Sequence, residues 1–243
     1  MNSEIREGLL SRFKEEATLG TFVAYKVDDY LIIASDRERS GEGRLPASTF
    51  KIANSLIALE TGVVQDPDKD VFKWDGVKRA NEDWNKDHTL RSAIAVSAFP
   101  VYQEIARRIG QEQMQKYVDL FEYGNRNIGG GIDTFWVSGD LRIDPVQQVD
   151  FVDRLRRGVL PISKRSQELV RDILPVTKVG DAIIRAKTGL TDGEHGSLGW
   201  LVGWAEKGAA QTVFALNMDC PEPRHVADRM TLAQACLRDI GAI

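Results

Sequence analysis

The sequence contains few of the residues that build disulfide frameworks and metal centres. There are two cysteines, Cys220 and Cys236, and three histidines among 243 residues. The cysteines lack a C-x-x-C spacing and the histidines lack an H-x-x-x-H pattern, so the sequence indicates neither a redox motif nor a zinc site. We therefore expect no bound metal, and the two cysteines are compatible with one disulfide or with two free thiols.

Two further absences narrow the class of partner. Lysine and arginine total 32 against 36 aspartates and glutamates, and there is no basic run, so nucleic acid is not an expected partner. No apolar run approaches the ~20 residues of a membrane span, and no membrane segment is expected. The first sixteen residues are polar and charged, without the apolar centre of a signal peptide, and we expect them to form a helix.

The remaining composition and patterning predict a packed chain with strands near both ends. Hydrophobic residues make up 42% of the chain, which suffices for the core of one domain or of two small interleaved ones. Residues 20–35 alternate apolar and polar side chains and predict two strands joined by a turn near Asp28 and Asp29. After Pro175 the pattern returns to strands and closes with a helix, and these elements are expected at residues 182–191, 196–207, 210–219 and 225–243.

The middle of the chain, residues 49 to about 174, has mainly helical spacing. Gly110 separates two predicted helices. Asp144 followed by Pro145 is typical of the start of a helix, and Ser163 is a second candidate capping residue.

These patterns together predict an α+β fold, with an antiparallel sheet flanked by terminal helices and an inserted all-helical region. We expect residues 1–45 and 176–243 to form the sheet part and residues 46–175 the helical part. The active site is expected at the interface of the two parts.

The segment "PASTFKIANSLIALETG" places Lys51 three residues after Ser48, within an apolar run. Residues three apart in a helix lie on one face, so Ser48 Oγ and Lys51 Nζ can approach each other. The positive end of a helix and apolar burial both lower the pKa of a lysine, and a neutral amine can take the proton of a serine. The alternative is that Ser48 is only a helix cap and Lys51 extends to solvent.

Two later stretches carry similar chemistry. Lys187, Thr188 and Gly189 end a predicted strand, where a cation, a hydroxyl and an accessible backbone can hold a carboxylate. Ser97 stands at a break between two helical segments and can relay a proton or hold a substrate group. Each stretch alone also fits an ordinary turn, but S-x-x-K, a serine turn and K-T-G in this order are much more specific.

With these motifs the sequence resembles the class D, oxacillinase-type serine β-lactamases over nearly its whole length. The resemblance rests on "PASTFKIANSLIALETG", "DVFKWDGVKR", "WNKDHTL", "FEYGNRNIGGGIDTFW", "RAKTG" and "GWLVGW". It implies a penicillin-recognising serine-enzyme fold and hydrolysis of β-lactam antibiotics. It also implies β-lactam small molecules as partners and a periplasmic or secreted location.

The resemblance implies a role for each matching residue. Ser48 would be the nucleophile that forms an acyl-enzyme, and Lys51 would react with carbon dioxide to give a carboxylated lysine that acts as general base. The Trp136 indole N–H would donate to that carboxylate, because a buried indole N–H needs an acceptor. No cofactor is implied beyond carbon dioxide or bicarbonate as the source of that group.

The resemblance assigns further residues around the nucleophile. Ser97 would be the second serine, and the backbone N–H groups of Ser48 and Leu190 would stabilise the tetrahedral intermediate. Arg229 would pair with the β-lactam carboxylate, although Arg224 can also be aligned with the arginine that has this role in the family. Tyr123, in the Tyr-Gly-Asn motif, has either a structural role or a contact with substrate. The residues implied in binding the substrate are Lys187, Thr188, Gly189, Arg229, Phe99 and Tyr123.

One position departs from the family pattern. The second motif of the family is Ser-x-Val, whereas this chain has Ser97, Ala98 and Phe99. The larger side chain borders Lys51, and overfilling a packed site costs ~1–3 kcal/mol. Either a neighbouring residue is smaller, or carboxylation of Lys51 is reduced, or the deacylating water is obstructed. We therefore expect slow deacylation or a need for added bicarbonate.

Other classes of protein share some of these motifs. The sensor domains of membrane-bound β-lactam receptors carry similar motifs and stay acylated, whereas a transpeptidase would have asparagine at position 99. A Ser-His-Asp hydrolase is excluded, because His195 stands where a nucleophile elbow needs glycine before Ser197. The sequence leaves open the oligomeric state and the substrate spectrum, which we expect to depend on the loops at 191–196 and 77–87.

Overall fold

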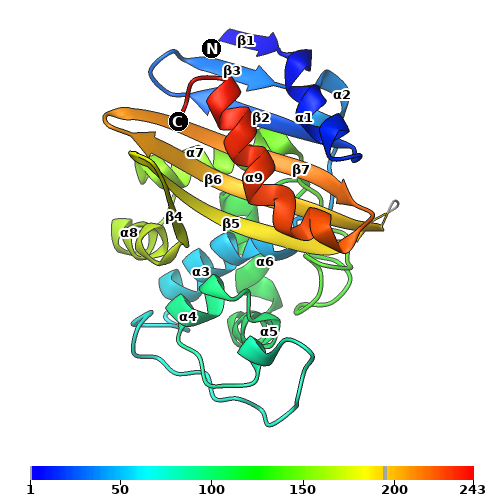
Figure 1. The fold of residues 1–243 in the computed structure, drawn as a ribbon. Helices are drawn as coiled ribbons and strands as arrows, with labels where there is room; N and C mark the ends of the chain where they lie inside the picture. The colour runs from blue at the N-terminus through cyan, green and yellow to red at the C-terminus, as the bar shows by residue number, and fades with distance from the viewer. Residues whose placement is uncertain (1, 194–195) are drawn as a thin grey trace.

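The computed structural model describes residues 2–193 and 196–243 and contains a seven-stranded sheet (Figure 1). The strand order is β1-β3-β2-β7-β6-β5-β4, and every pairing is antiparallel except that of β1 with β3. The strands are β1 (Asn2–Ile5), β2 (Gly20–Lys26), β3 (Leu31–Ala34), β4 (Val176–Val179), β5 (Ala182–Gly193), β6 (Gly196–Lys207) and β7 (Ala210–Cys220).

Helices cover both faces of the sheet and fill the middle of the chain. The α-helices are α1 (Leu10–Glu15), α2 (Arg37–Ser40), α3 (Lys51–Glu60), α4 (Leu90–Ala95), α5 (Phe99–Ile109), α6 (Gln111–Leu120), α7 (Pro145–Arg157), α8 (Lys164–Ile173) and α9 (Pro223–Asp239). Short 3₁₀ helices are η1 (Glu7–Leu9), η2 (Ala47–Phe50) and η3 (Glu82–Trp84).

The two faces of the sheet belong to two hydrophobic cores, because successive side chains of a strand point to opposite sides. In β2, Phe22 and Ala24 pack with the face that α1 and α9 cover. Val23 and Tyr25, which alternate with them, pack in the core that continues into the helical part. Figure 1 shows α9 crossing the near face of the sheet, with α7 behind it. The architecture is α+β, as predicted.

Most of the local predictions are confirmed. The turn at residues 27–30 joins β2 to β3, and Gly110 separates α5 from α6. The Asp144 side chain accepts a hydrogen bond from the backbone N–H of Gln147, with Pro145 as the first helical residue of α7. Ser163 caps α8 through a bond from the backbone N–H of Ser166.

Three local predictions are wrong. Residues 2–5 form a strand instead of the first turn of a helix, because the outer edge of β3 is open and pairs with their backbone groups. Strand β4 pairs with β5 and was not predicted from its four residues. The segments 61–89 and 121–144 contain little helix, so the middle of the chain is less helical than its spacing suggested.

Helix α7 connects the two predicted parts of the chain. It belongs to the segment 46–175, yet it packs against β2, β6 and β7. The residues that it buries include Val149, Phe151 and Val152, which join the core shared by the sheet and the other helices. The helical segment 46–175 therefore supplies α7 as a layer on one face of the sheet. The division of the chain into a sheet part and a helical part stays a prediction.

Candidate active site

Ser48 and Lys51 lie next to each other where η2 runs into α3. Lys51 Nζ donates a hydrogen bond to Ser48 Oγ at 2.6 Å. The turn that carries Ser48 is a 3₁₀ helix, in which side chains three residues apart are eclipsed. The structure thus brings the predicted pair together, through a tighter turn than the expected α-helix.

The residue before Ser48 has a strained backbone. Ala47 is fully buried and has a φ of 50°, which is uncommon for a residue with a Cβ. Its backbone N–H donates to the carbonyl of Trp136 at 2.8 Å, and this bond links the turn to the 121–144 segment. Strain of this kind persists only where the surroundings enforce it, and it occurs often at functional sites.

Lys51 is fully buried among aromatic rings. Its Nζ lies 5.6 Å from the ring centre of Phe99 and 5.2 Å from that of Tyr102. Burial lowers the pKa of Lys51 from 10.5 to about 7. In the described part of the chain the only side chain to which this amine donates is that of Ser48, and no carboxylate is bonded to it. Because the pKa is about 7, a large share of Lys51 is a neutral amine at neutral pH.

Trp136 is fully buried and contacts Phe99, one of the two aromatic rings next to Lys51. Its ring stacks on Phe50 with centroids 5.7 Å apart and meets Phe99 nearly edge-on at 6.0 Å. Its indole N–H has no hydrogen-bond partner in the described residues. A buried donor without an acceptor is costly, so this N–H is available to donate to a group bound beside it.

A second pair of hydroxyl and amine lies close by. Lys187 Nζ donates to Ser97 Oγ at 2.6 Å and to the Thr188 carbonyl at 2.9 Å. Burial and the positive charges of Lys51 and Arg229 hold the pKa of Lys187 well below its ordinary value. Ser97, like Ala47, has a positive φ, at 55°. The break between α4 and α5 therefore points this hydroxyl at β5.

Both serines open onto one cavity of about 420 Å³. None of its described lining residues is acidic and Arg229 is basic, so the cavity favours a negatively charged ligand. The lining residues are Ser48, Asn81, Trp84, Val96, Ser97, Phe99, Val137, Thr188, Gly189, Leu190 and Arg229.

The strand β5 and the helix α9 form the basic side of the cavity. Arg229 Nη1 donates to the Gly189 carbonyl at 2.5 Å, which fixes the guanidinium beside the strand. A Cβ on Gly189 would lie 3.1 Å from both the Pro46 carbonyl and Thr49, so a larger residue would press on the turn that carries Ser48. Arg224, the alternative to Arg229, is exposed and pairs instead with Glu16 and Glu222.

Tyr123 does not reach the cavity. It is fully buried and contacts the rings of Phe50 at 5.4 Å and Phe151 at 4.9 Å. Asn125 in the same motif donates to the Asp140 carbonyl at 2.9 Å and so fastens the 121–144 segment. Of the two roles left open for Tyr123, these contacts favour the structural one.

Asn81 and Trp84 are site residues that the sequence patterns do not indicate. Both line the cavity from the 61–89 segment, whose loop at 77–87 was expected only to shape the choice of substrate. A turn-forming sequence shows no periodicity, so nothing in it indicates which side chains face the site. The other loop expected to shape the substrate range includes Glu194 and His195, which lie outside the described residues.

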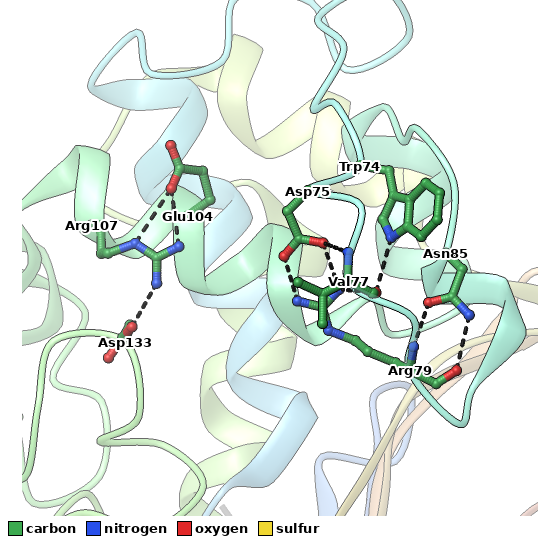
Figure 2. A network of polar contacts seen from close by, with 8 residues as sticks. All are labelled: Trp74, Asp75, Val77, Arg79, Asn85, Glu104, Arg107 and Asp133. Carbon is green, nitrogen blue, oxygen red and sulfur yellow. Dashed lines mark hydrogen bonds and ion pairs between the residues drawn. The ribbon is translucent and has the colours of Figure 1, made fainter.

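A second cavity of about 270 Å³ lies on the other side of Trp84. Its lining is rich in charge, but the charges are paired: Arg107 contacts both Glu104 and Asp133, as Figure 2 shows. Lys73 is likewise paired with Asp87. This cavity therefore lacks the uncompensated positive charge of the one beside Ser48.

The described residues contain no group of three acidic, cysteine or histidine side chains that could hold a metal ion. Cys220 and Cys236 are both buried free thiols, which settles the choice between a disulfide and two thiols.

The fold and the two amine–hydroxyl pairs define a class, that of the penicillin-recognising serine enzymes. In agreement, the family model of the penicillin-binding protein transpeptidase domain matches residues 20–240. Beta-lactamase OXA-5 of Pseudomonas aeruginosa is 42% identical over 248 residues, which cover 100% of this chain and 92% of the relative. Beta-lactamase OXA-48 of Klebsiella pneumoniae is 41% identical, with 95% of this chain and 85% of the relative covered.

Solved structures narrow the class further. The class D β-lactamase FUS-1 (OXA-85) of Fusobacterium nucleatum subsp. polymorphum superposes with a TM-score of 0.93 at 35% identity, over 99% of this chain and 100% of that one. A class D β-lactamase of Sebaldella termitidis gives a TM-score of 0.93 at 32% identity, with both chains fully covered. This chain belongs to the class D β-lactamase family.

Proposed function

We propose that the chain hydrolyses β-lactams through an acyl-enzyme on Ser48. The observation that carries this proposal is the 2.6 Å contact between Ser48 Oγ and a buried lysine whose pKa is lowered to about 7. A serine next to a neutral amine is an activated nucleophile, and it opens onto a cavity that favours anions. Membership of the family supports the same reaction.

The residues of the cavity divide the work of the reaction. Thr188 and Arg229 hold the substrate carboxylate, which places the β-lactam carbonyl carbon at Ser48. Ser48 Oγ bonds to that carbon as Lys51 takes its proton, and the ring C–N bond then breaks. Ser97, held by Lys187, is the hydroxyl through which a proton reaches the leaving ring nitrogen. Water then attacks the ester carbonyl and releases Ser48.

The residues around Lys51 also fit the carboxylated lysine that the family resemblance implies. Carbon dioxide reacts with an uncharged amine, and burial favours that form of Lys51. The unpartnered indole N–H of Trp136 would hold the added carboxylate, which is the fit that the structure offers. When present, the group supplies an anionic base for acylation and for activating water.

Phe99 is proposed to slow the second half of the reaction. It is partly buried, lines the cavity with Ser48 and Ser97, and lies 5.6 Å from Lys51 Nζ. A ring in this place takes up room beside the base that must activate water. We therefore propose that acylation is fast and that the acyl-enzyme is hydrolysed slowly.

The alternative function, a sensor that remains acylated, is not favoured. The relatives and structural neighbours compared with this chain are β-lactamases. No helix among the described residues is long and apolar enough to cross a membrane. From the family resemblance we further propose a periplasmic or secreted location, which fractionation of the source cells would test.

Intact-protein mass spectrometry over time with benzylpenicillin tests the function. We expect an adduct of one penicillin on the wild type that appears and then decays, and none on Ser48→Ala. The absence of any adduct on the wild type would overturn Ser48 as nucleophile. An adduct that never decays would overturn hydrolysis and favour the sensor.

A further inference from the structure

The segment 71–88 forms part of the wall of the active-site cavity beside Val96, whose carbonyl accepts a hydrogen bond from the Trp84 indole. Two of its side chains, Asn81 and Trp84, line the cavity. The other residues on this side are apolar, namely Val96 and Phe99, apart from Ser97, whose hydroxyl already bonds Lys187. Asn81 is therefore the polar side chain of this wall that the reaction itself does not use.

The part of the segment that carries Asn81 is closed by bonds between its two ends. Arg79 N–H donates to Asn85 Oδ1 at 2.8 Å, and Asn85 Nδ2 donates back to the Arg79 carbonyl at 2.9 Å. Asp75 holds the Arg79 guanidinium through contacts of 2.6 and 2.8 Å (Figure 2). The turn from 79 to 85 is thus a preformed unit.

Trp84 attaches this unit to the rest of the site. Its indole N–H donates to the Val96 carbonyl at 3.0 Å, next to Ser97. Buried His88 contacts the Asp83 carbonyl through Nε2 at 2.8 Å. The position of Asn81 relative to Ser97 is therefore set by bonds at the two neighbouring residues Asp83 and Trp84.

The side chain of Asn81 is oriented as well as placed. Its Oδ1 accepts from the backbone N–H of Asp83 at 3.1 Å, and its own carbonyl accepts from Trp84 N–H at 3.1 Å. The structure gives its Nδ2 no acceptor within residues 2–193 and 196–243. Because Oδ1 is bound, the amide presents its two N–H donors as the free end.

The chemistry of the substrate points to a partner for these donors. A β-lactam carries its carboxylate and its acyl side chain on opposite sides of the carbonyl that Ser48 attacks. If Thr188 and Arg229 hold the carboxylate at one side of the cavity, the acyl side chain would extend toward the other side, where Trp84 and Asn81 line it. An acceptor on that side chain would meet the free donors of Asn81, beside an apolar surface for the rest of the group.

We propose that Asn81 is a specificity-determining residue that donates from Nδ2 to a hydrogen-bond acceptor on the acyl side chain of the substrate. The substrate class that it favours is β-lactams with a carboxylate or another acceptor next to an aromatic acyl group. This inference rests on the proposed function, because it concerns which substrates the same site accepts.

Three penicillins of one skeleton test it. Benzylpenicillin, carbenicillin and ampicillin share a phenyl side chain and carry hydrogen, carboxylate or ammonium, respectively, on the same carbon. The quantity compared is the ratio of kcat/KM for carbenicillin to that for benzylpenicillin. We expect Asn81→Leu to lower this ratio by about threefold to tenfold, the value of one hydrogen bond to a charged group at a partly wet site.

Asn81→Asp sharpens the test, because a carboxylate keeps the cap on Asp83 N–H and replaces the two donors by an anion. We expect the carbenicillin ratio to fall by more than tenfold and the corresponding ampicillin ratio to rise. The matched control is Ala80→Asp, which adds the same charge at an exposed neighbour that does not line the cavity, and we expect little change there.

The outcomes separate the two proposals. If benzylpenicillin is hydrolysed and the carbenicillin ratio stays within twofold of wild type in both Asn81 variants, the inference is wrong and the proposed function stands. An equal fall in Ala80→Asp would mean that general charge repulsion, and no contact of Asn81, decides the ratio. If the wild type neither hydrolyses nor binds any of the three, the proposed function itself fails.

Discussion

The ring of Phe99 lies nearly edge-on against Trp136, with centroids 6.0 Å apart, and the same ring lies 5.6 Å from Lys51 Nζ. Phe99 thus contacts both the buried lysine and the tryptophan whose indole N–H has no partner among the described residues. The face of an aromatic ring attracts a cation and repels an anion. Its presence favours an ammonium on Lys51 over a carboxylated lysine, in addition to the space that it takes up.

Replacing Phe99 by valine is expected to increase the carboxylation of Lys51 and to shorten the lifetime of the acyl-enzyme. The loss of one cation–π contact corresponds to a change of about threefold to tenfold in the affinity for bicarbonate. Carbon-13 NMR with labelled bicarbonate measures the carboxylation directly, and mass spectrometry measures the decay of the adduct.

Phe99→Leu is the control that separates the size of the side chain from its ring. If the ring charge distribution matters most, leucine and valine behave alike; if size dominates, leucine resembles the wild type. Equal NMR signals and equal adduct lifetimes in all three proteins would show that Phe99 does not affect Lys51.

The buried Lys51 makes a second prediction about the dependence of stability on pH. Its pKa is about 7 in the folded chain against an ordinary value of 10.5, so the unfolded chain binds the extra proton more tightly between these values. The unfolding free energy therefore rises with pH across this window. Lys51→Met, which removes the group, is expected to be more stable than wild type by about 5 kcal/mol at pH 6, with the difference fading towards pH 10.5.

Urea unfolding of both proteins in buffers free of carbon dioxide measures this difference. Lys51→Met lacks the base and is expected to show no turnover at any pH, so only its stability is compared. A difference in unfolding free energy that stays constant from about pH 6 to about pH 10 would contradict the lowered pKa.

Ser97 and Lys187 make a third prediction, which separates chemistry from backbone strain. Removing the hydroxyl by Ser97→Ala or Ser97→Gly is expected to slow acylation by about 100-fold or more, the usual effect of losing a positioned proton relay. Only glycine relieves the positive φ of 55°, so the glycine variant is expected to be the more stable of the two by about 1 kcal/mol.

Stopped-flow acylation with nitrocefin and thermal unfolding of both variants measure the two effects separately. If acylation recovers in the glycine variant alone, then the strained backbone, and not the hydroxyl, contributes to the rate. Unchanged acylation in both variants would remove Ser97 from the reaction.

The sequence reveals those parts of the site that depend on residues close together in the chain, and it does not reveal those that depend on contacts between distant segments. Ser48 and Lys51 are three positions apart, so helical geometry alone brings them together, and the strand pattern around Lys187 is visible in its periodicity. The unusual φ of Ala47 cannot be read in this way, because it is held by the carbonyl of Trp136, far along the chain. The role of Asn81 depends on bonds within an irregular turn, where no periodic pattern marks the inward side.

The lack of local determinants also explains the errors in the fold. Strand β1 contains the polar residues Asn2, Ser3 and Glu4, whose pattern is not that of a strand, and it exists because the edge of β3 supplies its partners. Strand β4 pairs with β5 alone and exposes Val176. Strands of four residues at the edge of a sheet have too few side chains to show alternation.

The Tyr-Gly-Asn motif leads to a last prediction, about its structural role. Gly124 has a φ of 55°, and a Cβ there would overlap the backbone carbonyl of Arg142. Gly124→Ala is therefore expected to cost more than ~3 kcal/mol of unfolding free energy, because strain and overlap add. The matched control is Gly62→Ala, where φ is also positive at 76° but no atom lies within 4 Å, and about 1 kcal/mol is expected.

Tyr123→Phe completes the test, because the phenol is fully buried and its hydroxyl has no hydrogen-bond partner in the described residues. Removing an unpaired buried hydroxyl leaves the packing against Phe50 and Phe151 intact, so stability within ~1 kcal/mol of wild type is expected. Because Tyr123 lies outside the cavity, kcat/KM for benzylpenicillin is expected to change less than about threefold. A large loss of kcat/KM with normal stability would instead place this hydroxyl in contact with the substrate.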